Sequence, residues 1–218
     1  MWTTTTRPAR RDSHRARCLV VALAVSVATV LAAGTASADP TARTRVTVIG
    51  DSVMASFGYV PTARRTLGSG LDLQSDSAVC RRLVAASCPF QGSTPSTALQ
   101  VVTARGRSLG SIVVINVGYN DWAAVYDVDR VMKALRAAGV REVIWVTLRE
   151  ASSYASLYAQ SNARIRKAAR RWRNLTVADW NAYSKGKPWF STDGLHPTAS
   201  GAVALARLLR PLVLASAQ

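Results

Sequence analysis

The chain has 218 residues, of which 49% are hydrophobic and 18% are charged. This length predicts one domain with a short extra segment, and the hydrophobic content excludes a globally disordered chain. The 28 Lys and Arg residues outnumber the 12 Asp and Glu residues, for a net charge of +16. Such a charge favours contact with anionic surfaces such as wall polymers, phospholipid or nucleic acid. Most of the cations are Arg, which indicates a compositional bias but does not explain the excess of basic over acidic residues.

Residues 1–38 are predicted to be a signal peptide. Five Arg residues from Arg7 to Arg17 precede an apolar run, 19–33, and Ala36-Ser37-Ala38 matches a small-x-small cleavage site. The run is shorter than the ~20 residues that a spanning helix needs, which favours cleavage over an uncleaved membrane anchor. We therefore expect a secreted, wall-facing protein with no stable membrane insertion after cleavage. Arg10-Arg11 leaves both Sec and twin-arginine export open.

Cleavage changes the charge and the cysteine count. It leaves 23 basic and 11 acidic residues, or about +12, with 39–44 as a short N-terminal segment before the domain at 45–218. Cys18 is removed, so Cys80 and Cys88 remain as an even pair in an oxidising compartment, and we predict that they form a disulfide. The alternatives are two free thiols or a metal site. A metal site is disfavoured, because two cysteines and one distant histidine supply too few ligands.

Short β-branched runs alternate with longer helical patterns from Arg45 onward. Strands are predicted at 46–49, 71–79, 111–117, 142–148 and 175–180, and helices at 128–138 before Gly139, at 154–172, and at 198–210 with a stop at Pro211. Near-continuous apolar strands of this kind are typical of a parallel sheet that is covered on both faces. The predicted architecture is a single three-layer α/β domain with about five parallel strands.

The helix predicted at 154–172 carries an apolar stripe on one face and a basic cluster on another. The stripe contains Tyr158, Ile165, Ala168, Ala169 and Trp172, and the basic cluster contains Arg164, Arg166, Lys167, Arg170, Arg171 and Arg173. A solvated helix face is the favoured interpretation of the cluster, and contact with an anionic polymer is the alternative. No basic groove interleaved with aromatic residues is found, so nucleic acid is not an expected partner.

Three short motifs carry candidate chemistry. The mature chain has one histidine, His196, and Asp193 precedes it by three residues, a spacing that can place the carboxylate against one ring nitrogen and leave the other nitrogen as a base. Ser52 follows the first strand and opens a helix, where its hydroxyl would be exposed near backbone N–H groups. Asn120 follows the clearest strand, and its amide could donate to an oxyanion. The alternatives are a surface histidine, a helix N-cap at Ser52 and a plain Asn-Asp turn at 120–121. No Gly-x-Ser-x-Gly elbow is present at Ser52.

Together these motifs resemble the SGNH (GDSL-like) hydrolase family over residues 45 to 215. Gly50-Asp51-Ser52 is similar to its first block, Gly118-x-Asn120-Asp121 to its third and Asp193-x-x-His196 to its last. The resemblance implies a flavodoxin-like sheet of strand order 2-1-3-4-5 and ester or acyl chemistry without a cofactor.

The second block departs from the family pattern. It normally supplies a glycine N–H to the oxyanion hole, and here Cys80 matches the glycine, with Gly92 as the other candidate. A cysteine could serve there provided that its φ is negative. Three features also resemble peptidoglycan O-acetyltransferase catalytic domains and related wall-facing esterases. They are the Gly-Asp-Ser-Val-Met opening, an Arg after the second block and an Asp-Gly-x-His close.

The expected function is therefore a secreted serine esterase with Ser52 as nucleophile, His196 as base and Asp193 as its orienting carboxylate. Ser52, Cys80 and Asn120 are the expected oxyanion donors, and the substrate is a small ester or an O-acylated glycan. The alternatives are an O-acyltransferase acting on cell-wall glycan and a non-catalytic polyanion-binding protein of the same fold. Trp122 and Trp189 flank the motifs, together with Phe190, and either line the substrate site or belong to the packing.

Overall fold

The computed structural model describes residues 43–218, and the predicted signal peptide at 1–38 lies outside these residues. Five parallel strands form one sheet in the order β2-β1-β3-β4-β5. The strands are β1 (Arg45–Gly50), β2 (Asp72–Ser77), β3 (Ile112–Asn116), β4 (Glu142–Val146) and β5 (Leu175–Ala178). The predicted α/β fold class and strand order are confirmed.

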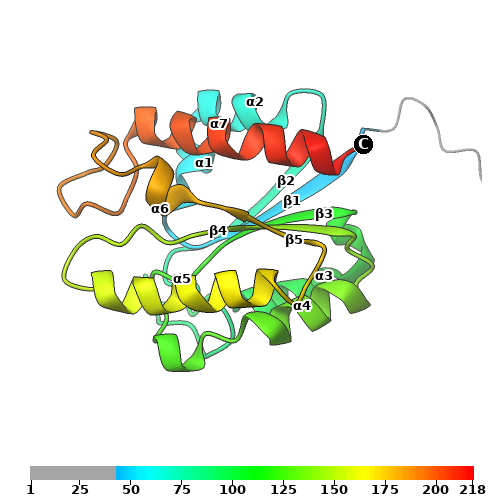
Figure 1. The fold of residues 1–218 in the computed structure, drawn as a ribbon, viewed down its shortest axis with the longest axis horizontal. Coiled ribbons are helices and arrows are strands. Elements are labelled where there is room, and N and C mark those ends of the chain that lie inside the picture. Colours follow the sequence, from blue (N-terminus) through cyan, green and yellow to red (C-terminus); the bar gives the residue numbers. More distant parts are fainter. Residues whose placement is uncertain (1–42) are drawn as a thin grey trace, which may run out of the picture. The chain divides into compact units, whose positions relative to one another are not determined.

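Helices cover both faces of the sheet (Figure 1). One face carries α1 (Ser56–Tyr59), α2 (Pro61–Gly68), α6 (Trp180–Tyr183) and α7 (Ala199–Ser216). The other carries α3 (Ala98–Arg105), α4 (Val128–Ala137) and α5 (Ala155–Ala169), with the 3-10 turns η1 (Gly106–Leu109) and η2 (Ala123–Val125). Alternate residues of β3 and β4 enter the two cores, because successive side chains of a strand point to opposite faces. This explains why these strands are apolar at nearly every position.

The C-terminal helix continues past Pro211, so the predicted stop at this residue is wrong. Proline removes the N–H that would donate to the carbonyl of Arg207, but both residues are exposed and water can solvate that carbonyl. Leu209 and Val213, on either side of the proline, are buried against the sheet and keep the helix in place. Within residues 43–218, α7 is also the one helix long and apolar enough to resemble a membrane span, a property that core helices share.

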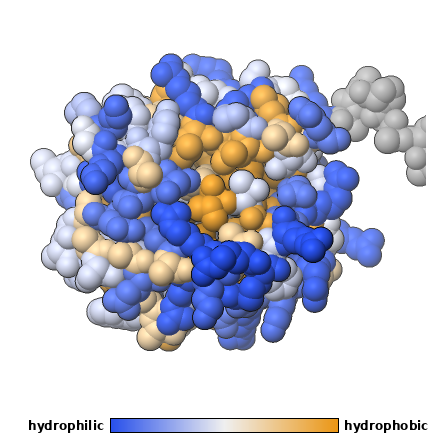
Figure 2. Space-filling view, in the orientation of Figure 1, coloured by the Kyte–Doolittle hydropathy of each residue, from blue (hydrophilic) through white to orange (hydrophobic). Residues whose placement is uncertain are grey.

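Helix α5 buries the stripe side chains Tyr158, Ile165 and Ala168, and its basic face is turned outward. Figure 2 shows strongly hydrophilic residues gathered over the part of the molecule that α5 occupies. Two of the six basic side chains have carboxylate partners: Arg166 lies 3.0 Å from Asp179, and Arg171 pairs with Asp129. The other four basic side chains are exposed. The face is therefore mostly solvated, in agreement with the favoured prediction of a solvated helix face.

Candidate active site

Ser52 lies in a turn between β1 and α1, directly after the C-terminal end of the strand. The N-cap of α1 is Ala55, so Ser52 neither opens nor caps this helix, and the N-cap alternative is wrong. The turn packs tightly over Gly50. A Cβ at that position would lie 2.2 Å from the Cβ of Met54 and 2.8 Å from the hydroxyl of Ser77. Only glycine therefore permits this turn, which leaves the Ser52 side chain partly exposed.

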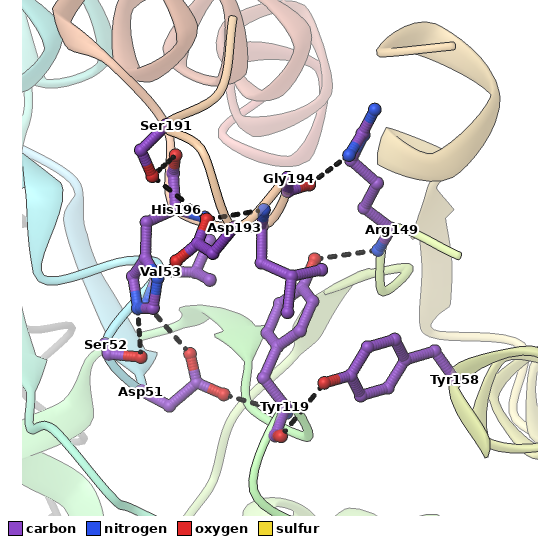
Figure 3. Close-up of polar contacts among 11 residues, drawn as sticks. Asp51, Ser52, Val53, Tyr119, Arg149, Tyr158, Ser191, Asp193, Gly194 and His196 are labelled. Atoms are coloured by element: carbon purple, nitrogen blue, oxygen red, sulfur yellow. Dashed lines mark hydrogen bonds and ion pairs between the residues drawn. The ribbon is translucent and has the colours of Figure 1, made fainter. Parts of the chain in front are cut away.

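The side chains of Ser52, His196 and Asp193 form one hydrogen-bonded chain (Figure 3). The Ser52 hydroxyl lies 2.9 Å from Nε2 of His196, and Nδ1 of His196 lies 2.5 Å from Oδ2 of Asp193. Oδ1 of Asp193 accepts hydrogen bonds from the N–H groups of Leu195 and His196 and from the Ser191 hydroxyl. Partial burial opposes ionisation of Asp193, but the hydrogen bonds from His196, Leu195 and Ser191 together hold its pKa well below the ordinary value. The carboxylate is thus ionised and fixes the ring tautomer.

Arg149, near the start of the loop that follows β4, contacts the loop that carries His196. Its Nη1 donates to the carbonyl of Gly194, and its guanidinium carbon lies 3.8 Å from the centre of the Phe190 ring. Its backbone N–H donates to the hydroxyl of Tyr119 over 2.7 Å. Gly194 has a φ of 71°, a conformation that glycine adopts without strain. Arg149 was not a sequence-based candidate, because no local motif marks it.

Asp51 is fully buried and joins the Ser52 turn to the loop after β3 (Figure 3). Its Oδ2 accepts from the N–H groups of Gly118 and Tyr119 over 3.0 and 3.1 Å, and its Oδ1 accepts from Val53 over 3.1 Å. Burial raises the pKa of this carboxyl to about 6, against the lowering effect of these three hydrogen bonds. Asp51 thus links the Gly50-Asp51-Ser52 motif to the motif that begins at Gly118, a role that its place in the sequence does not indicate.

Asn120 lies at the same edge of the sheet, in the turn that follows β3. Its Nδ2 donates to the carbonyl of Arg81 over 3.3 Å, which fixes the side chain beside the 80–82 segment. The next residue, Asp121, is buried and accepts from the N–H of Leu83. Burial raises the pKa of Asp121 to about 7. The third motif is therefore both a turn and a clamp on the loop that carries Cys80.

Cys80 and Cys88 form the predicted disulfide, with Cα atoms 5.2 Å apart. The expectation of a negative φ at Cys80 is wrong: its φ is 65°, in the left-handed region that favours glycine. The disulfide and the bond from Cys88 N–H to the Cys80 carbonyl, over 3.3 Å, hold the residue in that conformation. Within residues 43–218, no acceptor takes up the N–H of Cys80 or that of Ser52.

Gly92, the other candidate, lies in an exposed turn between Phe90 and Ser93. These two residues exchange backbone hydrogen bonds of 2.7 and 3.0 Å, which close the turn on itself. The placement favours Cys80 over Gly92 as the residue that matches the second block.

The two tryptophans lie in different surroundings. Trp189 stacks on Trp180 with ring centres 6.0 Å apart and packs against the core beneath α7, which favours packing over substrate lining. Trp122 is 59% exposed and borders a hollow that also contains Asn120. In residues 43–218, no three His, Cys, Asp or Glu side chains lie close enough together to hold a metal ion.

Comparison with known proteins finds similarity at the level of structure. No family model and no curated protein sequence matches the chain. The C-terminal catalytic domain of Streptococcus pneumoniae peptidoglycan O-acetyltransferase A, solved with a methylsulfonyl adduct, is 21% identical with a TM-score of 0.58, over 80% of this chain and 95% of that one. A carbohydrate acetylesterase family member from Sinorhizobium meliloti is 18% identical with a TM-score of 0.59, over 79% and 98%. A Desulfitobacterium hafniense protein described as a lipolytic protein of the G-D-S-L family is 12% identical with a TM-score of 0.51, over 78% and 99%. The strand order, the parallel sheet and these neighbours together show that the chain has the SGNH hydrolase fold.

Proposed function

We propose that the protein is a serine esterase that hydrolyses carboxylic esters and so removes acyl or O-acetyl groups from its substrates. The observation that carries this proposal is the hydrogen-bonded chain from Ser52 through His196 to Asp193. It gives a hydroxyl nucleophile a base within 2.9 Å, and it gives that base an ionised carboxylate as orienting group. Within the described residues the N–H groups of Ser52 and Cys80 have no acceptor, and with the Asn120 amide they are the donors that we propose for the oxyanion.

The proposed reaction proceeds in two half-reactions. Ser52 Oγ attacks the ester carbonyl carbon as Nε2 of His196 takes its proton, and the N–H groups of Ser52 and Cys80 and the Asn120 amide stabilise the oxyanion. Collapse of the tetrahedral intermediate breaks the bond to the alcohol, which leaves with the proton from Nε2. Water then attacks the acyl-enzyme carbonyl as Nε2 takes its proton, and collapse of this second tetrahedral intermediate releases the acid as Nε2 returns the proton to Ser52 Oγ.

A serine-reactive fluorophosphonate tests this proposal directly. Labelling of the wild-type protein at Ser52, together with loss of aryl-acetate hydrolysis in Ser52→Ala, is the expected result. Ser69→Ala, which changes an exposed serine after α2, is the matched control and should keep both properties. Full activity in Ser52→Ala would remove Ser52 as the nucleophile, and absence of any label or ester hydrolysis in the wild type would favour a non-catalytic protein that binds anionic polymers.

An O-acyltransferase is the second candidate, favoured by the similarity to the peptidoglycan O-acetyltransferase domain. Both activities share the acyl-enzyme and differ only in whether water or a sugar hydroxyl resolves it. Incubation with an acetyl donor and a chitotriose acceptor, followed by mass spectrometry of the sugar, separates the two. We further propose that the protein is exported by its N-terminal segment and acts at the cell wall, where its excess of basic residues would contact anionic polymer.

A further inference from the structure

A hollow of about 250 Å³ borders the loop that follows β3, next to Asn120. Its walls include Arg82, Tyr119, Asn120, Trp122, Tyr154 and Leu157. We propose that this hollow is a subsite for one sugar ring of an O-acylated glycan, which the enzyme holds while the ester reaches Ser52. The inference rests on the proposed esterase function and adds to it a substrate class and the residues that recognise it.

Two large aromatic side chains stand exposed around this hollow. Trp122 is 59% exposed and Tyr154 is 54% exposed, although burial of either ring would remove a large apolar surface from water. Single exposed aromatic residues are common, but two that line one hollow form an apolar contact surface. The C–H face of a pyranose ring is flat and apolar enough to stack on such rings, and its hydroxyl groups point away from that face.

Tyr154 stands at the end of a row of three tyrosine rings that borders the hollow. Its ring centre lies 6.3 Å from that of Tyr158, which makes an edge-on contact of 5.1 Å with Tyr119. The Tyr158 hydroxyl donates to the backbone carbonyl of Tyr119 over 3.3 Å, which ties this row of rings to the loop after β3. A site built in this way loses little conformational entropy when a ring binds.

Polar groups in the hollow have unused hydrogen-bonding capacity. Arg82 donates from Nε to the carbonyl of Asn120 over 2.7 Å and from Nη1 to that of Ala86 over 3.1 Å. Within residues 43–218, its Nη2 has no acceptor and Oδ1 of Asn120 has no donor. A guanidinium donor and an amide acceptor suit the hydroxyl groups of a sugar. An acyl chain would gain nothing from either, so the lining favours a sugar over a fatty acyl group.

The position and size of the hollow suit one ring of a substrate that reacts at Ser52. Asp51, adjacent to Ser52, binds the N–H groups of Gly118 and Tyr119, so the loop that borders the hollow is fastened to the nucleophile turn. Asn120 belongs both to the proposed oxyanion site and to the wall of the hollow. The volume lies below the ~300–1,000 Å³ of pockets for drug-sized ligands, which corresponds to one ring rather than a longer segment.

Steady-state kinetics on two acetyl esters tests the subsite. Trp122→Ala and Tyr154→Ala are compared with Tyr59→Ala, which removes a ring that is 64% exposed on α1 and does not line the hollow. We expect the ratio of kcat/KM for O-acetylated chitotriose to that for 4-nitrophenyl acetate to fall by about tenfold in each subsite variant, mainly through KM, and to be unchanged in the control. Equal losses on both esters would overturn the subsite. A loss that instead grows with acyl length, from acetate to octanoate, would overturn it in favour of an acyl pocket.

A binding measurement separates failure of the subsite from failure of the esterase proposal. Calorimetric titration of Ser52→Ala with chitotriose is expected to show binding that Trp122→Ala weakens about tenfold and Tyr59→Ala does not. Ester hydrolysis by the wild type without this Trp122-dependent binding would overturn the subsite alone. Trp122-dependent binding by a wild-type protein that hydrolyses no ester would overturn the esterase proposal and leave the glycan site. Thermal unfolding of each variant checks that it is folded.

Discussion

Replacement of Arg81 by methionine should destabilise the loop that carries Cys80, one of the three proposed oxyanion donors. The Arg81 side chain is buried and donates to Oδ1 of Asp76 over 2.8 Å and to the carbonyls of Asp76, Ser96 and Gly50 over 2.5, 2.9 and 3.4 Å. Gly50 keeps a second donor, the N–H of Ala78, at 3.1 Å. The main losses are thus the ion pair with Asp76 and the donors to two carbonyls.

The expected loss of unfolding free energy is moderate. Breaking a fully buried ion pair costs ~3–5 kcal/mol, but the Asp76 side chain is 33% exposed, and water takes up part of that cost. With ~1 kcal/mol for each carbonyl left without its donor, the total is about 2–4 kcal/mol, a substantial part of the ~5–15 kcal/mol of a typical domain. Methionine fills most of the volume of the arginine stem, so the cavity contribution is small.

Urea unfolding of the wild type, Arg81→Met, Arg81→Lys and Arg64→Met measures this loss. Arg64 is exposed on α2, and its replacement should change the unfolding free energy by less than about 0.5 kcal/mol. Arg81→Lys keeps the charge beside Asp76 but not the planar fork, so it should fall between the two methionine variants. Turnover of an aryl ester should also fall in Arg81→Met, because the Arg81 carbonyl holds the Asn120 amide. Equal unfolding midpoints for Arg81→Met and Arg64→Met would refute this reasoning.

Three further expectations concern the candidate site. Asn120→Ala should lower kcat for an aryl ester by about 10²–10³ with a smaller change in KM, and an unchanged kcat would exclude Asn120 from the oxyanion site. Reduction of the Cys80–Cys88 disulfide should lower the unfolding free energy by about 2–3 kcal/mol and impair activity, unless mass spectrometry finds both thiols already free. The pKa of buried Asp51 is raised from 3.8 to about 6, so the native state binds its proton more readily than the unfolded state does. Its contribution to stability is therefore greatest below pH ~4 and is lost as pH rises through about 6, by roughly 3 kcal/mol. Burial of Asp121 acts in the same direction, so the measurement is the difference in pH slope between wild type and Asp51→Asn from pH 4 to 8, and equal slopes would contradict the expectation.

The fold could be predicted because the central strands are buried on both faces. Residues 112–115 and 143–146 are almost entirely apolar, and such runs leave few alternatives to a covered parallel sheet. Helices α1 and α6 have four residues each, too few to show a helical period, and the sequence did not mark them. The predicted helix end at Pro211 was also wrong. Proline usually ends a helix, but the apolar face of α7 continues beyond Pro211.

The candidate site could be located from its polar residues at strand ends, but its supporting contacts could not. Ser52, Asn120 and His196 follow predicted elements at the edge where parallel strands end, so their proximity follows from topology. The contact of Arg149 with Gly194 spans 45 positions and has no sequence signature. The positive φ of Cys80 was also hidden, since cysteine does not signal a left-handed conformation and the disulfide and tight loop impose it.

The exposure of the site bears on the choice between hydrolysis and transfer. The side chains of His196 and Asp193 are 43% and 45% exposed, so bulk water at about 55 M reaches the base that would activate it. A sugar acceptor can compete only if it is held beside Ser52 at a higher effective concentration, as oriented binding allows. The proposed subsite, the hollow lined by Trp122 and Tyr154 beside Asn120, could hold such a ring. For the proposed esterase we therefore expect hydrolysis to predominate, and any transfer would depend on how tightly that hollow binds the acceptor.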